Sequence, residues 1–146
     1  MLQRRRHPVL DSRIARWLAV AGWMALIFFL SSQPQLPSAP DPWADLLFKK
    51  GAHFTVYAVL AVLFRRALSP GRWIWALSWI LAMLYAASDE WHQSFVPGRH
   101  PQPTDVLIDA CGATTGLLIF WWLQRRAQAP AVHGGASATT QTLADK

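Results

Sequence analysis

The sequence predicts an all-α fold, a polytopic membrane protein formed by a bundle of four transmembrane helices. Hydrophobic residues make up 53% of the 146 residues and charged residues only 15%, which is too apolar for a small soluble domain. The apolar residues gather in four blocks, and Lys and Arg lie in short clusters that bracket these blocks, as is typical of membrane-flanking charge. The net charge of +6 therefore indicates a bilayer, and not nucleic acid, as the partner of this chain.

The first block, residues 14–30, follows a basic segment that contains Arg4, Arg5 and Arg6. This order resembles a signal peptide, but the next segment, SSQPQLPSAP, offers no convincing cleavage site of small residues. We therefore predict that the first span is retained. The same Pro- and Ser-rich segment cannot continue a helix and predicts the first loop.

The other three blocks cover residues 51–64, 73–87 and 106–123. Each block reaches about 17–20 residues with its flanks, which is near the length of a helical span. The second is the shortest, because two Lys precede it and two Arg follow it. LSPGR predicts a tight turn before the third block, and VPGR predicts a break after it.

The distribution of basic residues predicts the orientation. Most Lys and Arg fall on one side of the spans, and few fall on the other: Arg4, Arg5, Arg6, Arg13, Arg16, Arg65, Arg66, Arg72, Arg125, Arg126 and Lys146 against Lys49, Lys50 and Arg99. The positive-inside rule then places both termini in the cytoplasm and residues 31–50 and 92–104 outside. We expect a basic cytoplasmic segment at 1–13, a four-helix membrane domain at 14–126 and a disordered cytoplasmic tail at 127–146.

Polar residues at the outer ends of three spans share helix faces, at about 100° per residue. They are Lys50, His53 and Tyr57 on the second span; Tyr85, Asp89, His92 and Gln93, with Glu90 at the edge, on the third; and Asp105, Asp109, Gly112 and Gly116 on the fourth. Ionisable side chains that face lipid cost about 2.5–3.5 kcal/mol each at mid-membrane. We therefore expect these spans to converge on one pocket, with the first span packed peripherally.

A purely structural role stays open for each of these residues. Pairs such as Lys50–Asp109 or Arg99–Asp89 would tie helices together without serving a ligand. The spacing of Gly112 and Gly116 permits close helix approach, which on a polar face favours packing within the bundle over dimerisation. The single cysteine, Cys111, points away from this face and can form no internal disulfide.

Four motifs follow one another along the chain: FFLSSQP, KGAHFTVYAVLAVLFR, SDEWHQSFVPGR and DVLIDACGATTG. With them, residues 28–116 resemble the VanZ-like family of bacterial membrane proteins. The resemblance marks these positions: Ser32, Gln33, Pro34, Lys50, His53, Tyr57, Asp89, Glu90, His92, Gln93, Phe95, Pro97, Gly98, Arg99, Asp105, Asp109, Gly112 and Gly116. The sequence departs from the family pattern at Lys49, Gln102 and Asp109, where an acid, a Ser and an Asn are frequent. The extra carboxylate of Asp109 favours a cation partner.

The resemblance implies a multi-pass protein of the bacterial cytoplasmic membrane. The family's namesake is linked to resistance to the glycopeptide teicoplanin, which acts on cell-wall precursors outside the membrane. We therefore expect a polar site at the outer face that binds or acts on an anionic, lipid-linked substrate of the cell envelope. Neither the residues nor the resemblance identifies a reaction.

An enzyme would draw its acid and base from Asp89, Glu90, His92 and Asp109, because close carboxylates cannot all stay ionised in a low-dielectric site. Substrate contacts would come from the remaining polar residues of these faces and of the VPGR turn: Lys50, His53, Tyr57, Gln93, Arg99 and Asp105. VPGR would fold Arg99 back over Asp89 or Glu90, where its guanidinium could exchange the acid for a phosphate.

Three alternatives stay open. In a metal-assisted version, His53, His92 and nearby carboxylates would hold Zn²⁺, Mn²⁺ or Mg²⁺, although DEWHQ lacks the i, i+4 His pair of metalloprotease helices. A non-catalytic interaction or scaffold module would need the same pocket. A small transporter is disfavoured, because four short spans without an inverted repeat leave little room for alternating access.

Overall fold

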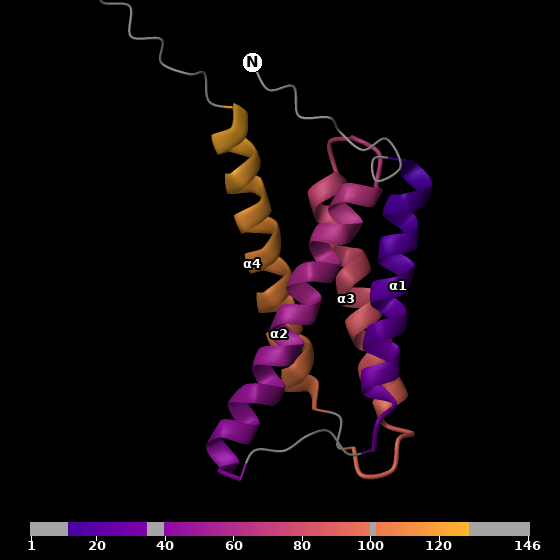
Figure 1. The fold of residues 1–146 in the computed structure, drawn as a ribbon, viewed down its shortest axis with the longest axis vertical. Coiled ribbons are helices and arrows are strands. Elements are labelled where there is room, and N and C mark those ends of the chain that lie inside the picture. The colour runs from indigo at the N-terminus through magenta and orange to yellow at the C-terminus, as the bar shows by residue number, and fades with distance from the viewer. Residues whose placement is uncertain (1–11, 35–39, 100–101, 129–146) are drawn as a thin grey trace, which may run out of the picture.

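The computed structural model describes residues 12–34, 40–99 and 102–128. They form four α-helices: α1 (Arg13–Ser31), α2 (Pro42–Ala67), α3 (Ile74–Gln93) and α4 (Pro103–Gln128) (Figure 1). The predicted all-α fold is confirmed. Nearly all of the predicted N-terminal segment and tail, and His100 in the second loop, lie outside the described residues.

Three of the four helices, α1, α2 and α4, are long and apolar enough to cross a membrane. The third helix, α3, is apolar over most of its length, but it continues through the polar residues 88–93 to Gln93. This polar last turn and a half lowers its mean hydropathy. Length and composition therefore support three of the four predicted spans.

Helix α2 begins earlier than its apolar block predicted. Asp41 accepts a hydrogen bond from the backbone N–H of Ala44 at 2.8 Å, and Pro42 occupies the first turn. Both residue types favour a helix start at these positions. Lys49 and Lys50 consequently lie inside the helix, where their side chains can reach neighbouring helices.

Helix α2 occupies the centre of the bundle and contacts each of the other three helices (Figure 1). Helix α1 packs against α2 and α3 but not against α4. The start of α1, the connection from α2 to α3 and the end of α4 lie at one end of the molecule (Figure 1). The end of α1, the start of α2, the end of α3 and the start of α4 lie toward the other end, where the start of α2 points away from α1 and α3 (Figure 1).

The closest packing joins α2 to α4, which run in the same direction (Figure 1). A Cβ added at Gly112 would lie 2.9 Å from the carbonyl carbon of Phe54, and one added at Gly116 would lie 2.9 Å from that of Ala58. Only glycine permits this approach of two backbones. The predicted role of this glycine pair in packing within the bundle is confirmed.

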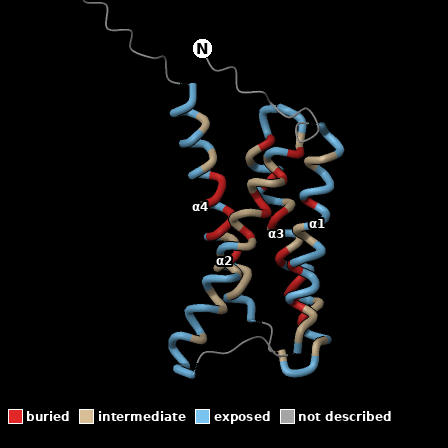
Figure 2. The backbone as a smooth tube through the Cα atoms, in the orientation of Figure 1, coloured by how far each residue is buried: buried red, intermediate tan, exposed pale blue. Residues whose placement is uncertain are grey.

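Buried positions lie along the facing sides of the helices, and the C-terminal part of α4 carries none (Figure 2). The core joins residues of all four helices, including Val20, Tyr57, Leu60, Ala86 and Ala113. Many large apolar side chains are instead exposed, among them Leu18, Phe29, Leu84, Leu107 and Leu118. An apolar exterior of this extent is expected where lipid, and not water, surrounds the protein.

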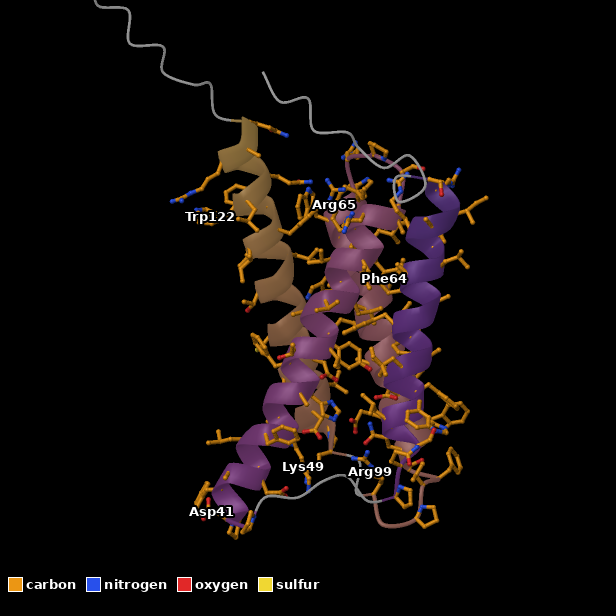
Figure 3. The ribbon with its side chains drawn as sticks, viewed as in Figure 1. Asp41, Lys49, Phe64, Arg65, Arg99 and Trp122 are labelled. Atoms are coloured by element: carbon orange, nitrogen blue, oxygen red, sulfur yellow. The ribbon has the colours of Figure 1, made fainter. Side chains whose placement is uncertain are left out.

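The two ends of the molecule carry opposite charge. The basic end holds most of the described cations: Arg13, Arg16, Arg65, Arg66, Arg72, Arg125 and Arg126. The acidic end holds the described carboxylates: Asp41, Asp45, Asp89, Glu90, Asp105 and Asp109. Figure 3 shows Arg65 and Trp122 toward the first end and Asp41, Lys49 and Arg99 toward the second.

Arginines of the basic end stack on tryptophans. The guanidinium of Arg65 lies 4.3 Å from the ring centre of Trp75, and that of Arg126 lies 3.8 Å from the ring centre of Trp122. Tryptophan and arginine pair in this way at the boundary between lipid and water.

Candidate functional site

A cavity of about 290 Å³ lies between α1, α2 and α3 near the acidic end. Its apolar wall is formed by Ile27, Leu30, Phe48, Ala52 and Val56. Its polar lining consists of Ser31, Lys49, His53, Tyr57, Asp89, Gln93 and Arg99. Helix α1 lies at the edge of the bundle, as expected, and does not contact α4. It nevertheless supplies one side of this cavity.

Two buried polar atoms at the cavity form no well-aligned hydrogen bond within the described part of the chain. They are Oδ1 of Asp89, a residue that is 5% exposed, and the hydroxyl of Tyr57, which is fully buried. The other carboxylate oxygen, Oδ2, accepts a hydrogen bond from Gln93 at 3.1 Å. The two groups interact with each other, but without a well-formed hydrogen bond between them. Buried polar atoms are nearly always paired, so the pair is a candidate for contact with a ligand.

A second group of polar side chains joins α2, α3 and α4 on the far side of His53. Nδ1 of His53 lies 3.2 Å from Oδ1 of Asp109, which is 1% exposed. Lys50 forms an ion pair with Asp105. Glu90 accepts a hydrogen bond from the backbone N–H of Gln102 at 3.0 Å. We call His53, Glu90, Asp105 and Asp109 the carboxylate–histidine cluster.

The structure therefore separates the predicted site into two parts that share His53. Tyr57, Asp89, Gln93 and Arg99 line the cavity, whereas Lys50, Glu90, Asp105 and Asp109 lie in or beside the cluster. The division arises because Asp89 and Glu90 are neighbours on α3 and therefore point in different directions. Glu90 is rotated about 100° from Asp89 around the helix, so it turns toward the start of α4.

His92 lies in neither part. Its Nε2 is 3.1 Å from the hydroxyl oxygen of Ser32, and its ring stacks on Phe28 with the ring centres 4.4 Å apart. The prediction grouped His92 with Asp89 because their helix faces are close. In the bundle, that edge of α3 faces α1, so His92 joins α3 to the C-terminal end of α1.

Arg99 does not pair with Asp89 or Glu90 among the described ion pairs. Its guanidinium donates instead to the backbone carbonyls of Gln33 and Leu30 at 3.0 and 2.9 Å. These carbonyls lie at and just beyond the C-terminal end of α1, where carbonyls lack helical partners. The predicted turn is present, with Gly98 at a φ of 81°, but it directs Arg99 to α1.

Sequence reasoning missed Lys49 as a site residue. Lys49 lines the cavity and forms an ion pair with Asp45 at 2.7 Å. It lies four residues before His53, and this spacing places the two on one helix face. Lys49 could be predicted as a site residue only if the helix began before residue 49, and the apolar block did not predict such an early start.

A sequence model of the family described as VanZ/LLP1 matches residues 16–124. The chain belongs to the VanZ/LLP1 family. The match covers all of α2 and α3 and nearly all of α1 and α4, so cavity and cluster both lie within the family region. Searches of curated proteins and of solved structures found no match.

Proposed function

We propose that this VanZ/LLP1 protein binds an anionic, lipid-linked precursor of the cell envelope at the outer half of the bacterial cytoplasmic membrane. One observation carries the proposal: a cavity whose wall is apolar holds two buried polar atoms without a well-formed hydrogen bond and is lined by two cations. An amphiphile offers a partner for each of these three features.

The apolar wall suits the chain of a lipid. Ile27 and Leu30 come from α1, and Phe48 and Val56 come from α2. Leu30 and Phe48 are 38% and 62% exposed, so the cavity has a margin on the lipid-facing side of the bundle. A chain could enter there without passing through water.

The cations suit a phosphate or carboxylate. Lys49 is partly exposed at the cavity, and its ammonium has three donors, only one of which is needed by Asp45. The guanidinium of Arg99 has five N–H donors and uses two of them on α1 carbonyls. Both cations therefore keep donors for an anionic headgroup, while Asp89 and Tyr57 can bind its hydroxyl or amide groups.

We further propose four membrane crossings with both termini in the cytoplasm, which would give this cavity an outward location. Helices α2 and α4 run in the same direction, so the chain must return across the bilayer between them, and α3 makes this return (Figure 1). The basic end then faces the cytoplasm, in line with the positive-inside rule. The acidic end and the cavity face outward.

Binding in nanodiscs tests the proposal. A fluorescent polyprenyl phosphate should bind the purified protein about tenfold or more tightly than the matched uncharged polyprenol, because the cations act only on the anion. Lys49→Met should remove most of this difference and leave polyprenol binding unchanged. Equal affinity for the two lipids in the unaltered protein would contradict anion recognition.

Turnover of the same labelled lipid, measured in parallel, separates an enzyme from a binding module. Release of phosphate or transfer of the labelled headgroup would assign catalysis. Retention of intact lipid would assign binding alone.

A further inference from the structure

We propose that His53, Glu90 and Asp105 bind one divalent transition-metal ion, Zn²⁺ or Mn²⁺. The three side chains come from α2, α3 and α4, and one ligand atom of each lies within 4.8 Å of the others. Ligands held about 2.1 Å from one ion lie about 3–4 Å apart, so small side-chain rotations would close the cluster. This site shares His53 with the cavity, but the proposal does not depend on lipid binding.

Asp109 prepares His53 as a ligand. Its Oδ1 lies 3.2 Å from Nδ1 of His53, and because an ionised carboxylate can only accept, Nδ1 carries the hydrogen. Nε2 is left with the lone pair that a metal ion requires. Metal-binding histidines usually donate their other N–H to a carboxylate or carbonyl in this way.

Glu90 provides independent evidence for a ligand. The residue is 8% exposed, and Oε2 accepts the hydrogen bond from Gln102 at 3.0 Å. The other oxygen, Oε1, is buried and has no hydrogen-bond partner in the described ranges. An unpaired buried carboxylate oxygen is costly, and a bound cation would satisfy it.

The charge of the cluster matches one divalent ion. Glu90, Asp105 and Asp109 interact electrostatically with one another and with His53, and Lys50 supplies one ammonium. With a neutral His53 and ionised carboxylates, three carboxylates against one ammonium leave an excess of two negative charges. A divalent ion would neutralise this excess, which only protons could reduce otherwise.

The donor set favours transition metals. Mg²⁺ and Ca²⁺ take oxygen ligands almost exclusively, whereas one imidazole with two carboxylates suits Zn²⁺, and Mn²⁺ accepts the same mixed set. Lys50 already neutralises Asp105, so its ammonium competes with an ion for that carboxylate. Removal of this ammonium should therefore strengthen metal binding.

Calorimetric titration of the chelator-stripped, full-length protein in nanodiscs tests the site, with an affinity tag that lacks histidine. We expect one Zn²⁺ or Mn²⁺ per chain and at least tenfold weaker binding of Mg²⁺. Glu90→Gln and Asp105→Asn should weaken binding by more than tenfold, and Asp109→Asn by about tenfold through the orientation of His53. His92→Ala, a histidine outside the cluster, should leave the affinity unchanged.

A variant that is expected to bind the metal more tightly keeps the test decisive if the acid variants fold poorly. Lys50→Met should bind Zn²⁺ or Mn²⁺ several-fold more tightly, whereas Lys49→Met, the adjacent lysine that pairs with Asp45, should match the unaltered protein. Absence of stoichiometric binding, or equal affinity in Glu90→Gln and the unaltered protein, would overturn the metal site. Because this titration contains no polyprenyl lipid, its failure would leave the lipid proposal standing.

Discussion

The contact between α2 and α4 leads to a quantitative prediction for Gly112→Ala. The atom nearest to the added methyl would be the carbonyl oxygen of Phe54, and the carbonyl carbon and Cα of that residue would lie 2.9 and 3.0 Å away. Carbon atoms in ordinary contact are about 3.5–4.0 Å apart, so the two helices must separate by at least about 0.6 Å. Backbone atoms of a helix cannot rotate away, which makes this separation the only relief.

Two opposing effects determine how much Gly112→Ala changes the free energy of unfolding. Overpacking at a close contact costs about 1–3 kcal/mol, and alanine in a helix regains about 0.8–1 kcal/mol over glycine. Because the atoms that the methyl meets belong to the backbone, the overpacking cost falls in the upper part of its range, and we expect a net loss of about 1–2 kcal/mol. Separation would also stretch the 3.2 Å contact between His53 and Asp109, because Phe54 adjoins His53, and the bond would be lost.

Equilibrium unfolding in mixed micelles, followed by tryptophan fluorescence, measures this loss. Gly116→Ala, which meets Ala58 in the same way, should be destabilised by a similar amount. Gly22→Ala is the matched control: nothing lies within 4 Å of its added methyl, so it should be as stable as the unaltered protein or slightly more stable. Equal stability of all three variants would show that α2 and α4 do not pack this closely.

Three further changes test the topology and the contacts of α1. The orientation is tested by single cysteines in a Cys111→Ser background. Ser94→Cys should react with an impermeant thiol reagent added to intact cells, whereas Ser69→Cys should react only after permeabilisation. The reverse pattern would refute the orientation. Arg99→Ala should lower the free energy of unfolding by about 1–3 kcal/mol, because it leaves the carbonyls of Leu30 and Gln33 without a charged donor. Arg99→Lys should restore part of this free energy. Unchanged stability of Arg99→Ala would show that these hydrogen bonds at the end of α1 are unimportant. His92→Ala should cost about 1–2 kcal/mol through loss of the Phe28 stack and the Ser32 contact, without changing metal affinity, and a loss of metal binding would place His92 in the cluster.

Periodicity predicted which faces of α2 and α4 meet, but not which side chains pair: Lys50 was considered with Asp109 and pairs with Asp105 instead. The i, i+3 spacing of Lys50 and His53 and the i, i+4 spacing of Asp105 and Asp109 place each pair on one helix face. In the structure Lys50 meets Asp105, and His53 meets Asp109. Helical geometry alone predicted which faces would meet, because polar residues in an apolar bundle must face one another.

The sequence could not predict partners that depend on the exact rotation of a helix. His92 shares an edge of α3 with Asp89, yet it contacts Ser32, because α1 covers that edge. Arg99 was expected over the acids, but it donates instead to two backbone carbonyls, of Leu30 at the end of α1 and of Gln33 just beyond it. Such carbonyls exist at the end of any helix and carry no signal in the residue types.

The central claim, that the cavity between α1, α2 and α3 holds the lipid, is tested most directly by filling it. Ala52 lies on the cavity wall, and Ala52→Phe would place a ring in the space that the lipid requires. Ala25 is exposed on α1 and does not line the cavity, so Ala25→Phe is the matched control. The affinity for a fluorescent polyprenyl phosphate in nanodiscs should fall by at least tenfold in Ala52→Phe and stay unchanged in Ala25→Phe. Unchanged affinity in a folded Ala52→Phe variant would contradict the account and place the lipid elsewhere on the protein.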